Sequence, residues 1–170
     1  MFLLGLGSNL SSSFGDRFEN LNLAISYLET YQIKIINRSS FYETPSYPDI
    51  KNPKFINLVV DVSTYLLPED LASVLIFVEE KLERKIIKKN EPRTCDIDII
   101  DYNGKVMEFT YKNLIFKVPH EKLVYRNFVL FPLREIAPKW VHPKNKDSID
   151  VLINKLSNED KKSILKIKKS

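Results

Sequence analysis

Apolar and polar positions along this chain follow two periods, one typical of strands and one of helices. Residues 2–6 form an apolar run that ends in Gly7-Ser8-Asn9, which predicts a buried strand followed by a glycine-dependent turn. Residues 34–42 alternate between apolar and polar, in a stretch that ends at Thr44-Pro45, and residues 55–64 are rich in β-branched side chains. Both stretches are predicted strands, as are residues 95–102, which end at the hairpin-type pair Asn103-Gly104.

Two long helices are predicted between these strands. Asp16 is placed to begin the first, because the apolar residues at positions 18, 21, 24, 25 and 28 then share one face. Pro68-Glu69-Asp70 supplies the chemistry of a helix start for the second, which we expect to end near Leu82. Residues 130–136 and 151–156 are predicted short helices.

The order strand, helix, strand, strand, helix, strand predicts an α+β fold of the ferredoxin-like split βαβ type. Its sheet is expected to be mainly antiparallel, with two long helices on one face and catalytic loops on the other. The absence of repeats and of Gly/Ser-rich linkers predicts one domain, residues 1–160, followed by a basic C-terminal tail, residues 161–170.

Composition narrows the class of protein. The single cysteine, Cys95, cannot form an internal disulfide, and no apolar run approaches the roughly 20 residues of a membrane helix. The start Met1-Phe2-Leu3-Leu4 lacks the basic region of a secretory leader. We therefore expect a monomeric cytoplasmic protein that binds neither membrane nor nucleic acid, although the net charge of +4 and the tail lysines leave nucleic-acid binding as an alternative.

The run Asp96-Ile97-Asp98-Ile99 is the first candidate for chemistry. Alternate side chains of a strand share a face, so Asp96 and Asp98 are neighbours and the isoleucines face the opposite side. Two such carboxylates suit Mg²⁺, which proteins usually hold with one or two carboxylates together with substrate phosphates. The alternative is a half-exposed strand with an acidic wet face.

Basic and aromatic residues surround this pair in the sequence. Arg93 can bind phosphate through paired hydrogen bonds or form a salt bridge with an aspartate, and Arg84, Lys85, Lys88 and Lys89 form a basic stretch before it. His120 with Arg126 is a second candidate phosphate contact, with a structural histidine as the alternative. Phe55 and Asn57, two apart on one strand, and Phe128 can hold a flat heterocycle, unless the phenylalanines are simply core.

Seven segments, in this order, resemble the hydroxymethyl-dihydropterin pyrophosphokinase family. They are Gly5-Leu6-Gly7-Ser8-Asn9-Leu10, Phe41-Tyr42-Glu43-Thr44-Pro45, Phe55-Ile56-Asn57, Pro92-Arg93-Thr94-Cys95-Asp96-Ile97-Asp98, Val118-Pro119-His120, Arg126-Asn127-Phe128-Val129-Leu130-Phe131-Pro132-Leu133 and Glu135-Ile136-Ala137-Pro138. The resemblance implies transfer of diphosphate from ATP to 6-hydroxymethyl-7,8-dihydropterin, with release of AMP, in folate biosynthesis.

The resemblance also implies roles for individual residues. Arg84, Arg93, Asp96 and Asp98 would be catalytic, and Asp96 and Asp98 would hold two Mg²⁺ ions. Glu79, Arg93, His120 and Arg126 would contact ATP. Thr44, Pro45, Phe55, Asn57 and Phe128 would bind the pterin, and Asn9 would brace the site.

The chain departs from the family pattern in the basic stretch. Where the family usually has Gly-Arg-X-Arg, this chain has Glu83-Arg84-Lys85-Ile86, so Lys85 or Lys88 would have to supply the lost charge. Two rival hypotheses therefore stay open: a member that binds pterin without transferring phosphate, and a non-enzymatic ferredoxin-like module that binds nucleic acid. The carboxylate pair argues against the second, because carboxylates repel phosphates.

Overall fold

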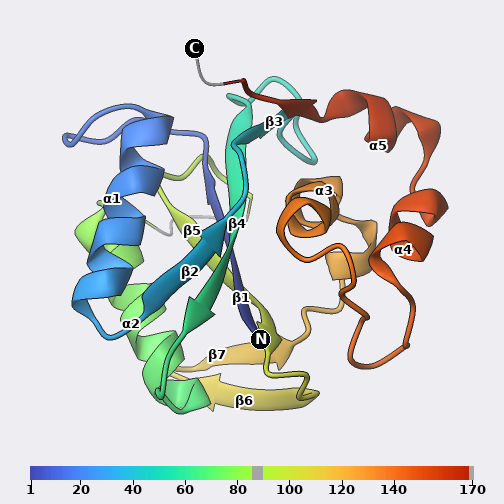
Figure 1. The fold of residues 1–170 in the computed structure, drawn as a ribbon. Coiled ribbons are helices and arrows are strands. Elements are labelled where there is room, and N and C mark those ends of the chain that lie inside the picture. The colour runs from blue at the N-terminus through green and yellow to red at the C-terminus, as the bar shows by residue number, and fades with distance from the viewer. Residues whose placement is uncertain (86–89, 169–170) are drawn as a thin grey trace.

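The computed structural model describes residues 1–85 and 90–168 and shows an antiparallel sheet between two layers of helices (Figure 1). The strands are β1 (Phe2–Ser8), β2 (Lys34–Arg38), β3 (Tyr42–Thr44), β4 (Phe55–Ser63), β5 (Asp96–Tyr102) and β8 (Leu165–Lys166). They lie in the order β5-β1-β4-β3-β8, with β2 also paired to β4. With its antiparallel pairings, this order confirms the predicted ferredoxin-like α+β class.

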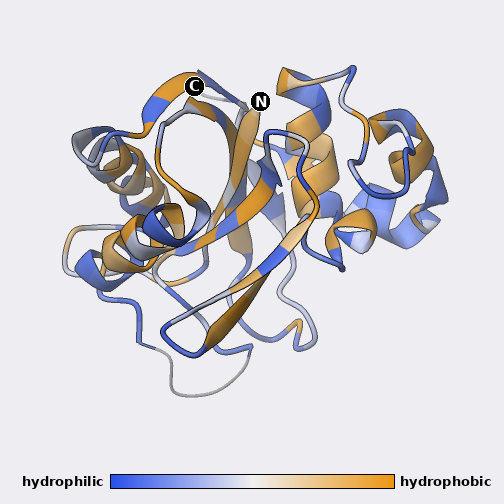
Figure 2. Ribbon diagram, turned by 90° about the horizontal axis from the view of Figure 1, so that it is seen from below, coloured by the Kyte–Doolittle hydropathy of each residue, from blue (hydrophilic) through white to orange (hydrophobic). Residues whose placement is uncertain are grey.

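The two long helices, α1 (Arg17–Thr30) and α2 (Pro68–Lys81), pack on one face of the sheet. Asp16 caps α1 as predicted: its side chain accepts from the amides of Phe18 and Glu19, and the Glu19 carboxylate accepts from the amide of Asp16. The apolar core beneath these helices includes Leu4, Leu6, Leu58, Val60, Leu21, Leu28, Leu71 and Leu75. In Figure 2 the hydrophobic side of each helix is turned mainly toward the sheet.

The second face was expected to carry loops alone, but helices cover part of it. A 3-10 turn (Leu123–Tyr125) leads into α3 (Asn127–Ile136), which is followed by α4 (Ile149–Lys155). A second apolar cluster joins Leu3, Val59 and Ile100 of the sheet to these helices, through Leu130, Leu133, Ile149 and Leu152. Helical cover follows from the apolar stripe of α3, which must be buried against the sheet.

Two local predictions were wrong in detail. The stretch 34–44 forms two strands rather than one, because Ser39 interrupts the ladder: its amide donates to the Val59 carbonyl (2.9 Å) and its hydroxyl accepts from the Val59 amide (3.0 Å). The turn at Asn103-Gly104 forms, but the following strand, β6 (Met107–Tyr111), pairs with β7 (Leu114–Val118) in a separate two-stranded sheet instead of with β5.

The C-terminal part of the chain runs from α4 back to the edge of the main sheet (Figure 1). Residues Asn158–Ser163 form the short helix α5, and β8 pairs with β3. Lys161, Lys162 and Lys166 of the predicted tail lie in these elements, whereas Lys169 lies outside the described residues. Across residues 1–85 and 90–168 no helix is both long and apolar enough to cross a membrane.

Candidate active site

Asp96 and Asp98 lie side by side on β5, on the face of the sheet that carries α3. Ile97 and Ile99, between and after them, are buried toward α1 and α2, as the alternation predicted. Asp96 pairs across the sheet with Gly7 of β1, and Asp98 pairs with Gly5. The two glycines have no side chains of their own, and neighbouring side chains lie over them: Asn57 over Gly7 and Ile100 over Gly5.

Gly7 does not form the turn that was predicted for it. It lies inside β1, and a Cβ atom added to it would be 2.9 Å from the side-chain oxygen of Asn57 on β4. The glycine is therefore needed for space, because the Asn57 side chain lies over the backbone of β1 at this point. This close approach joins the carboxylate pair on one side of β1 to the amide on the other.

Three arginines from separate parts of the chain converge on the two carboxylates. Arg84 follows α2, and its guanidinium contacts Asp96 at 2.8 Å and Glu79 at 2.5 Å. Arg93, just before β5, contacts the other oxygen of Asp96 at 3.0 Å, and Arg126 contacts Asp98 at 3.1 Å. Arginines in this arrangement neutralise acids that would otherwise repel one another, and they form a cationic rim suited to phosphate.

The end of α2 explains how Arg84 reaches this place. The amide of Arg84 donates to the Glu79 carbonyl (3.1 Å) and that of Glu83 to the Glu80 carbonyl (3.0 Å), the pattern of a Schellman motif. Glu83 has φ of +64°, a left-handed conformation that favours the glycine of the family pattern. Its carboxylate accepts from the backbone amide (2.9 Å) and the hydroxyl of Ser13, which offsets part of this strain.

Burial and charge shift the pKa values of the acids in this site. Glu79 accepts from the amide of Ile97 at 2.7 Å, and desolvation raises its pKa to about 8, although Arg84 acts in the opposite direction. Desolvation, followed by the charge of Asp96, raises the pKa of Asp98 to about 6, while 40% of its side chain stays exposed. Desolvation and then Arg126 lower the pKa of His120, which favours its neutral form.

A cleft of about 530 Å³ opens beside these residues. Its lining includes five residues singled out in the sequence, namely Glu79, Arg84, Asp96, Asp98 and His120. Sequence reasoning missed its apolar wall, which comes from Leu75 and Ile76 of α2 and from Leu114, Ile115 and Phe116 of the β6–β7 hairpin. The hairpin turns at Lys112 and Asn113, both of which have positive φ. Asn113, a residue type common at such turn positions, is the signal in the sequence that could have revealed the hairpin.

The residues expected to hold the pterin lie on the other side of β1. The Asn57 amide donates to the Thr44 hydroxyl at 3.0 Å, and Phe55 pairs with Thr44 across β3 and β4. Pro45, which follows β3, is exposed. The half-buried Phe55 ring lies 5.6 Å below the Arg93 guanidinium, which links this group directly to the carboxylates.

Phe128 is linked to the carboxylates in the same way. It is half-buried in the first turn of α3, and its ring lies 5.6 Å from the Arg126 guanidinium. Each carboxylate is thus paired with an arginine that also covers a phenylalanine: Asp96 with Arg93 and Phe55, Asp98 with Arg126 and Phe128. The carboxylates, the arginines and the phenylalanines singled out in the sequence therefore lie in one region of the molecule.

Asn9 ties this region together, as expected of a bracing residue. Its side-chain oxygen accepts from the Arg93 amide at 2.7 Å, and its backbone amide donates to the Arg93 carbonyl at 3.0 Å. Its side-chain amide donates to the Pro53 carbonyl (3.0 Å) and to the Ser46 hydroxyl (3.1 Å). One buried residue at the end of β1 thus fixes both Arg93 and the loop before Phe55.

The donor set fits Mg²⁺ that arrives with a nucleotide. Within residues 1–85 and 90–168, no group of three or more His, Cys, Asp or Glu side chains is arranged to hold a metal ion. Asp96 and Asp98 alone provide the two carboxylates that Mg²⁺ uses when phosphates and water complete its coordination. Of the residues invoked for the loop, Lys85 is exposed, and Ile86, Lys88 and Lys89 lie outside the described residues.

Comparisons with known proteins agree with this geometry. The 2-amino-4-hydroxy-6-hydroxymethyldihydropteridine pyrophosphokinase of a Synechocystis species is 34% identical over 155 residues, covering 91% of this chain and 75% of that protein. The enzyme of the same name from Aquifex aeolicus is 37% identical over 140 residues, covering 82% of each.

The fold has solved counterparts too. A Plasmodium falciparum HPPK-DHPS structure superposes with a TM-score of 0.72 at 18% identity, covering 91% of this chain and 44% of that one, so the present chain spans less than half of that protein. Residues 3–138 match the model of the family described as 7,8-dihydro-6-hydroxymethylpterin-pyrophosphokinase (HPPK). The chain therefore belongs to this pyrophosphokinase family, whose reaction is the transfer of diphosphate from ATP to 6-hydroxymethyl-7,8-dihydropterin in folate biosynthesis.

Proposed function

We propose that Asp96 and Asp98 hold two Mg²⁺ ions against the triphosphate of ATP, and that Arg84 and Arg93 act beside them as catalytic residues. The observation that carries this proposal is the placement of both carboxylates on one face of the sheet and in the lining of the cleft, each contacted by an arginine. When bound, the ions would withdraw negative charge from the phosphates that react.

Glu79, Arg93, His120 and Arg126 form the proposed contacts with ATP. His120 accepts a hydrogen bond at Nδ1 from the Lys122 amide (3.0 Å), so its neutral ring would carry a proton on Nε2 that can be donated to a phosphate oxygen. The apolar wall from α2 and the β6–β7 hairpin suits the flat base of the nucleotide. Arg84, Arg93 and Arg126 would exchange carboxylate oxygens for phosphate oxygens of similar geometry.

The pterin is proposed to bind between Phe55 and Phe128, with Asn57, Thr44 and Pro45 at its polar edge. Asn57 is buried, and its amide already donates to Thr44, so its oxygen is oriented for a donor on the ring. Phosphoryl transfer of this kind depends mainly on positioning. The hydroxymethyl oxygen would form a bond to the β-phosphorus as the bond between that phosphorus and the AMP oxygen breaks.

Release of AMP tests the proposal. Purified protein with ATP, Mg²⁺ and 6-hydroxymethyl-7,8-dihydropterin is expected to form AMP and pterin diphosphate in equal amounts. The Aquifex aeolicus relative serves as the positive control and should release AMP in the same assay. If the present protein is folded and binds the pterin but releases no AMP, the result would instead support a family member that has lost catalysis. Glu83 and Ile86 are the departures that motivate this second candidate.

We also propose that the protein is a cytoplasmic monomer that binds neither RNA nor DNA. A monomer would elute at the volume of a 19.9 kDa protein in size-exclusion chromatography. No shift of labelled RNA or DNA is expected in a gel at physiological salt, and cell fractionation should recover the chain in the cytoplasm. The division into a domain of residues 1–160 and a tail of residues 161–170 predicts that removal of the tail leaves the protein folded.

A further inference from the structure

The helix that carries Arg126 and Phe128 is held from outside by the C-terminal segment, Ser157–Lys168. This segment follows the last residue that matches the family model, residue 138. It leaves α4, forms α5 and then crosses to the sheet edge at β3, so that it spans α3 from one side to the other (Figure 1). The segment therefore lies beyond the residues that match the family model and touches a helix of the proposed site.

The first attachment is Asn127, which stands between Arg126 and Phe128. Its side chain is buried, and its amide donates to the Asp160 carbonyl (2.7 Å) and to the Ser163 hydroxyl (3.0 Å) of α5. The neighbouring side chains point to the site: Arg126 contacts Asp98, and Phe128 lies under the Arg126 guanidinium. The first turn of α3 thus binds the site on one side and the C-terminal segment on the other.

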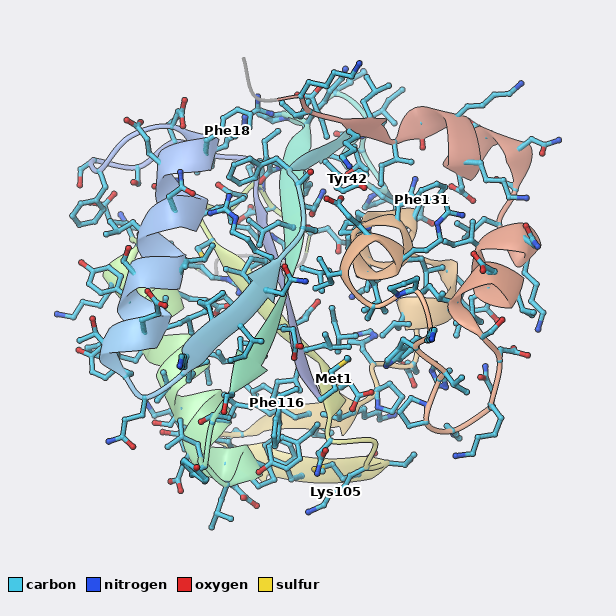
Figure 3. The ribbon with its side chains drawn as sticks, in the orientation of Figure 1. Met1, Phe18, Tyr42, Lys105, Phe116 and Phe131 are labelled. Atoms are coloured by element: carbon cyan, nitrogen blue, oxygen red, sulfur yellow. The ribbon has the colours of Figure 1, made fainter. Side chains whose placement is uncertain are left out.

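The second attachment lies at the opposite end of α3. Lys166 of β8 contacts the Glu135 carboxylate at 3.4 Å, and Glu135 also accepts from the Tyr42 hydroxyl at 2.7 Å. Tyr42 extends from β3 toward α3 beside Phe131 (Figure 3). The Ile167 amide donates to the Phe41 carbonyl at 2.8 Å, which extends the pairing of β8 with β3. One segment is therefore bonded to both α3 and β3.

These two elements carry opposite parts of the proposed pterin pocket. Thr44 and Pro45 come from the end of β3, and Thr44 accepts the amide of Asn57. Phe128 comes from α3. A segment bonded to both elements fixes the distance between them, because neither can move without breaking these hydrogen bonds or the backbone pairing.

We propose that the C-terminal segment, acting through Asn127 and Ser163, positions Phe128 for the pterin. This inference rests on the proposed function. Asn127 and Ser163 are positioning residues, since neither is placed to touch a substrate. Loss of either residue should weaken binding of the pterin more than binding of ATP. The pterin ring needs an aromatic surface at a set distance, whereas ATP has several other proposed contacts.

Steady-state kinetics of Asn127→Ala test the positioning role. Loss of two hydrogen bonds of ordinary strength predicts that KM for the pterin rises about fivefold or more, while KM for ATP changes by less than about twofold. Ser163→Ala keeps the bond to the Asp160 carbonyl and should fall between Asn127→Ala and the wild type. Asn154→Ala, the same substitution at an exposed position of α4, should leave both KM values unchanged.

Two outcomes of the kinetics would overturn the proposal. One is an unchanged KM for the pterin in Asn127→Ala that is folded by circular dichroism, even if its melting temperature is lower, since that is the result of a purely structural contact. The other is an equal rise of both KM values. Calorimetric titration with pterin alone separates the proposed function from the positioning role. Wild type that binds pterin but releases no AMP in the assay would contradict the proposed function. Equal pterin affinities of wild type and Asn127→Ala would contradict the positioning role.

Discussion

The same strands present two different faces: one is an apolar core under α1 and α2, and the other carries the charged and polar residues of the site beside α3. On the face of α1 and α2, Leu4, Leu58 and Ile97 enter an apolar core that is closed along the sheet. On the other face, α3 packs against Leu3, Val59 and Ile100 of the sheet. Asp96, Asp98 and Asn57 lie on the same face, next to this apolar contact. Alternation along each strand places a residue of the core next to a residue of the site.

The difference teaches how this chain keeps charged groups on a packed sheet. Burial stabilises the first face without help from specific partners, because the hydrophobic effect has no direction. The second face depends on pairs: each carboxylate has an arginine, and the Asn57 amide has Thr44. Substitutions on the first face should therefore lower the stability of the fold, whereas substitutions of Asp96, Asp98 or Asn57 on the second face should lower activity or binding.

The largest expected effect comes from neighbouring leucines of β1 that face opposite ways. Leu3→Ala and Leu4→Ala each remove a fully buried side chain, one from each cluster, and should each lower the free energy of unfolding by about 2–5 kcal/mol. Urea unfolding followed by circular dichroism measures both. A much smaller loss for Leu3→Ala would mean that the α3 layer unfolds separately. Leu67→Ala, at an exposed position, should cost under about 0.5 kcal/mol.

Substitution of one carboxylate tests the functional half of the comparison. Asp98→Asn keeps the shape of the side chain but removes a proposed ligand of Mg²⁺, so kcat should fall about 100-fold or more with little change in stability. The control is Asp61→Asn, at the far end of β4 on the same face, which should retain turnover. Full activity of Asp98→Asn in an AMP-release assay would refute the metal assignment.

The two glycines of β1 give a matched pair at the border between core and site. A Cβ at Gly7 would lie 2.9 Å from the Asn57 oxygen, whereas a Cβ at Gly5 would meet the flexible end of Ile100 at 3.2 Å. Gly7→Ala should therefore weaken pterin binding about tenfold by displacing Asn57, and Gly5→Ala should do so by less than about threefold. Calorimetric titration compares them, and equal affinities would show that Asn57 is not a pterin contact.

The smallest effect is a pH dependence carried by Glu79. Burial raises its pKa from 4.5 to about 8, so its contribution to stability is fully present below pH of about 4.5 and is lost as pH rises through about 8. Without metal or ATP, the wild type should therefore lose stability between pH of about 5 and 8. Glu79→Gln, which cannot titrate, should lose less stability over this interval. Asp98, shifted in the same direction, contributes to both proteins, so identical slopes in thermal melts would contradict the shift.

Local chemistry in the sequence was enough for much of the fold. The capping residue Asp16, the Pro68 start of α2 and the alternation at Asp96–Ile99 each act within a few residues, so each prediction survived the packing of the whole. The split of residues 34–44 was not predictable in this way, because it depends on the contact of Ser39 with Val59, which lies 20 residues further along the chain. The pairing of β6 with β7 was a local feature that the sequence analysis missed, since only Lys112 and Asn113 separate the two strands.

The site divides along the same line. The sequence supplied the residue types and their order, because carboxylates two apart on a strand share a face wherever that strand lies. Only the tertiary structure decided that Arg126 meets Asp98, how Gly7 makes room for Asn57, and how Asn127 binds α5, since these contacts join residues 28 to 50 positions apart. Their geometry follows from the packing of helices on the sheet, which no local pattern specifies.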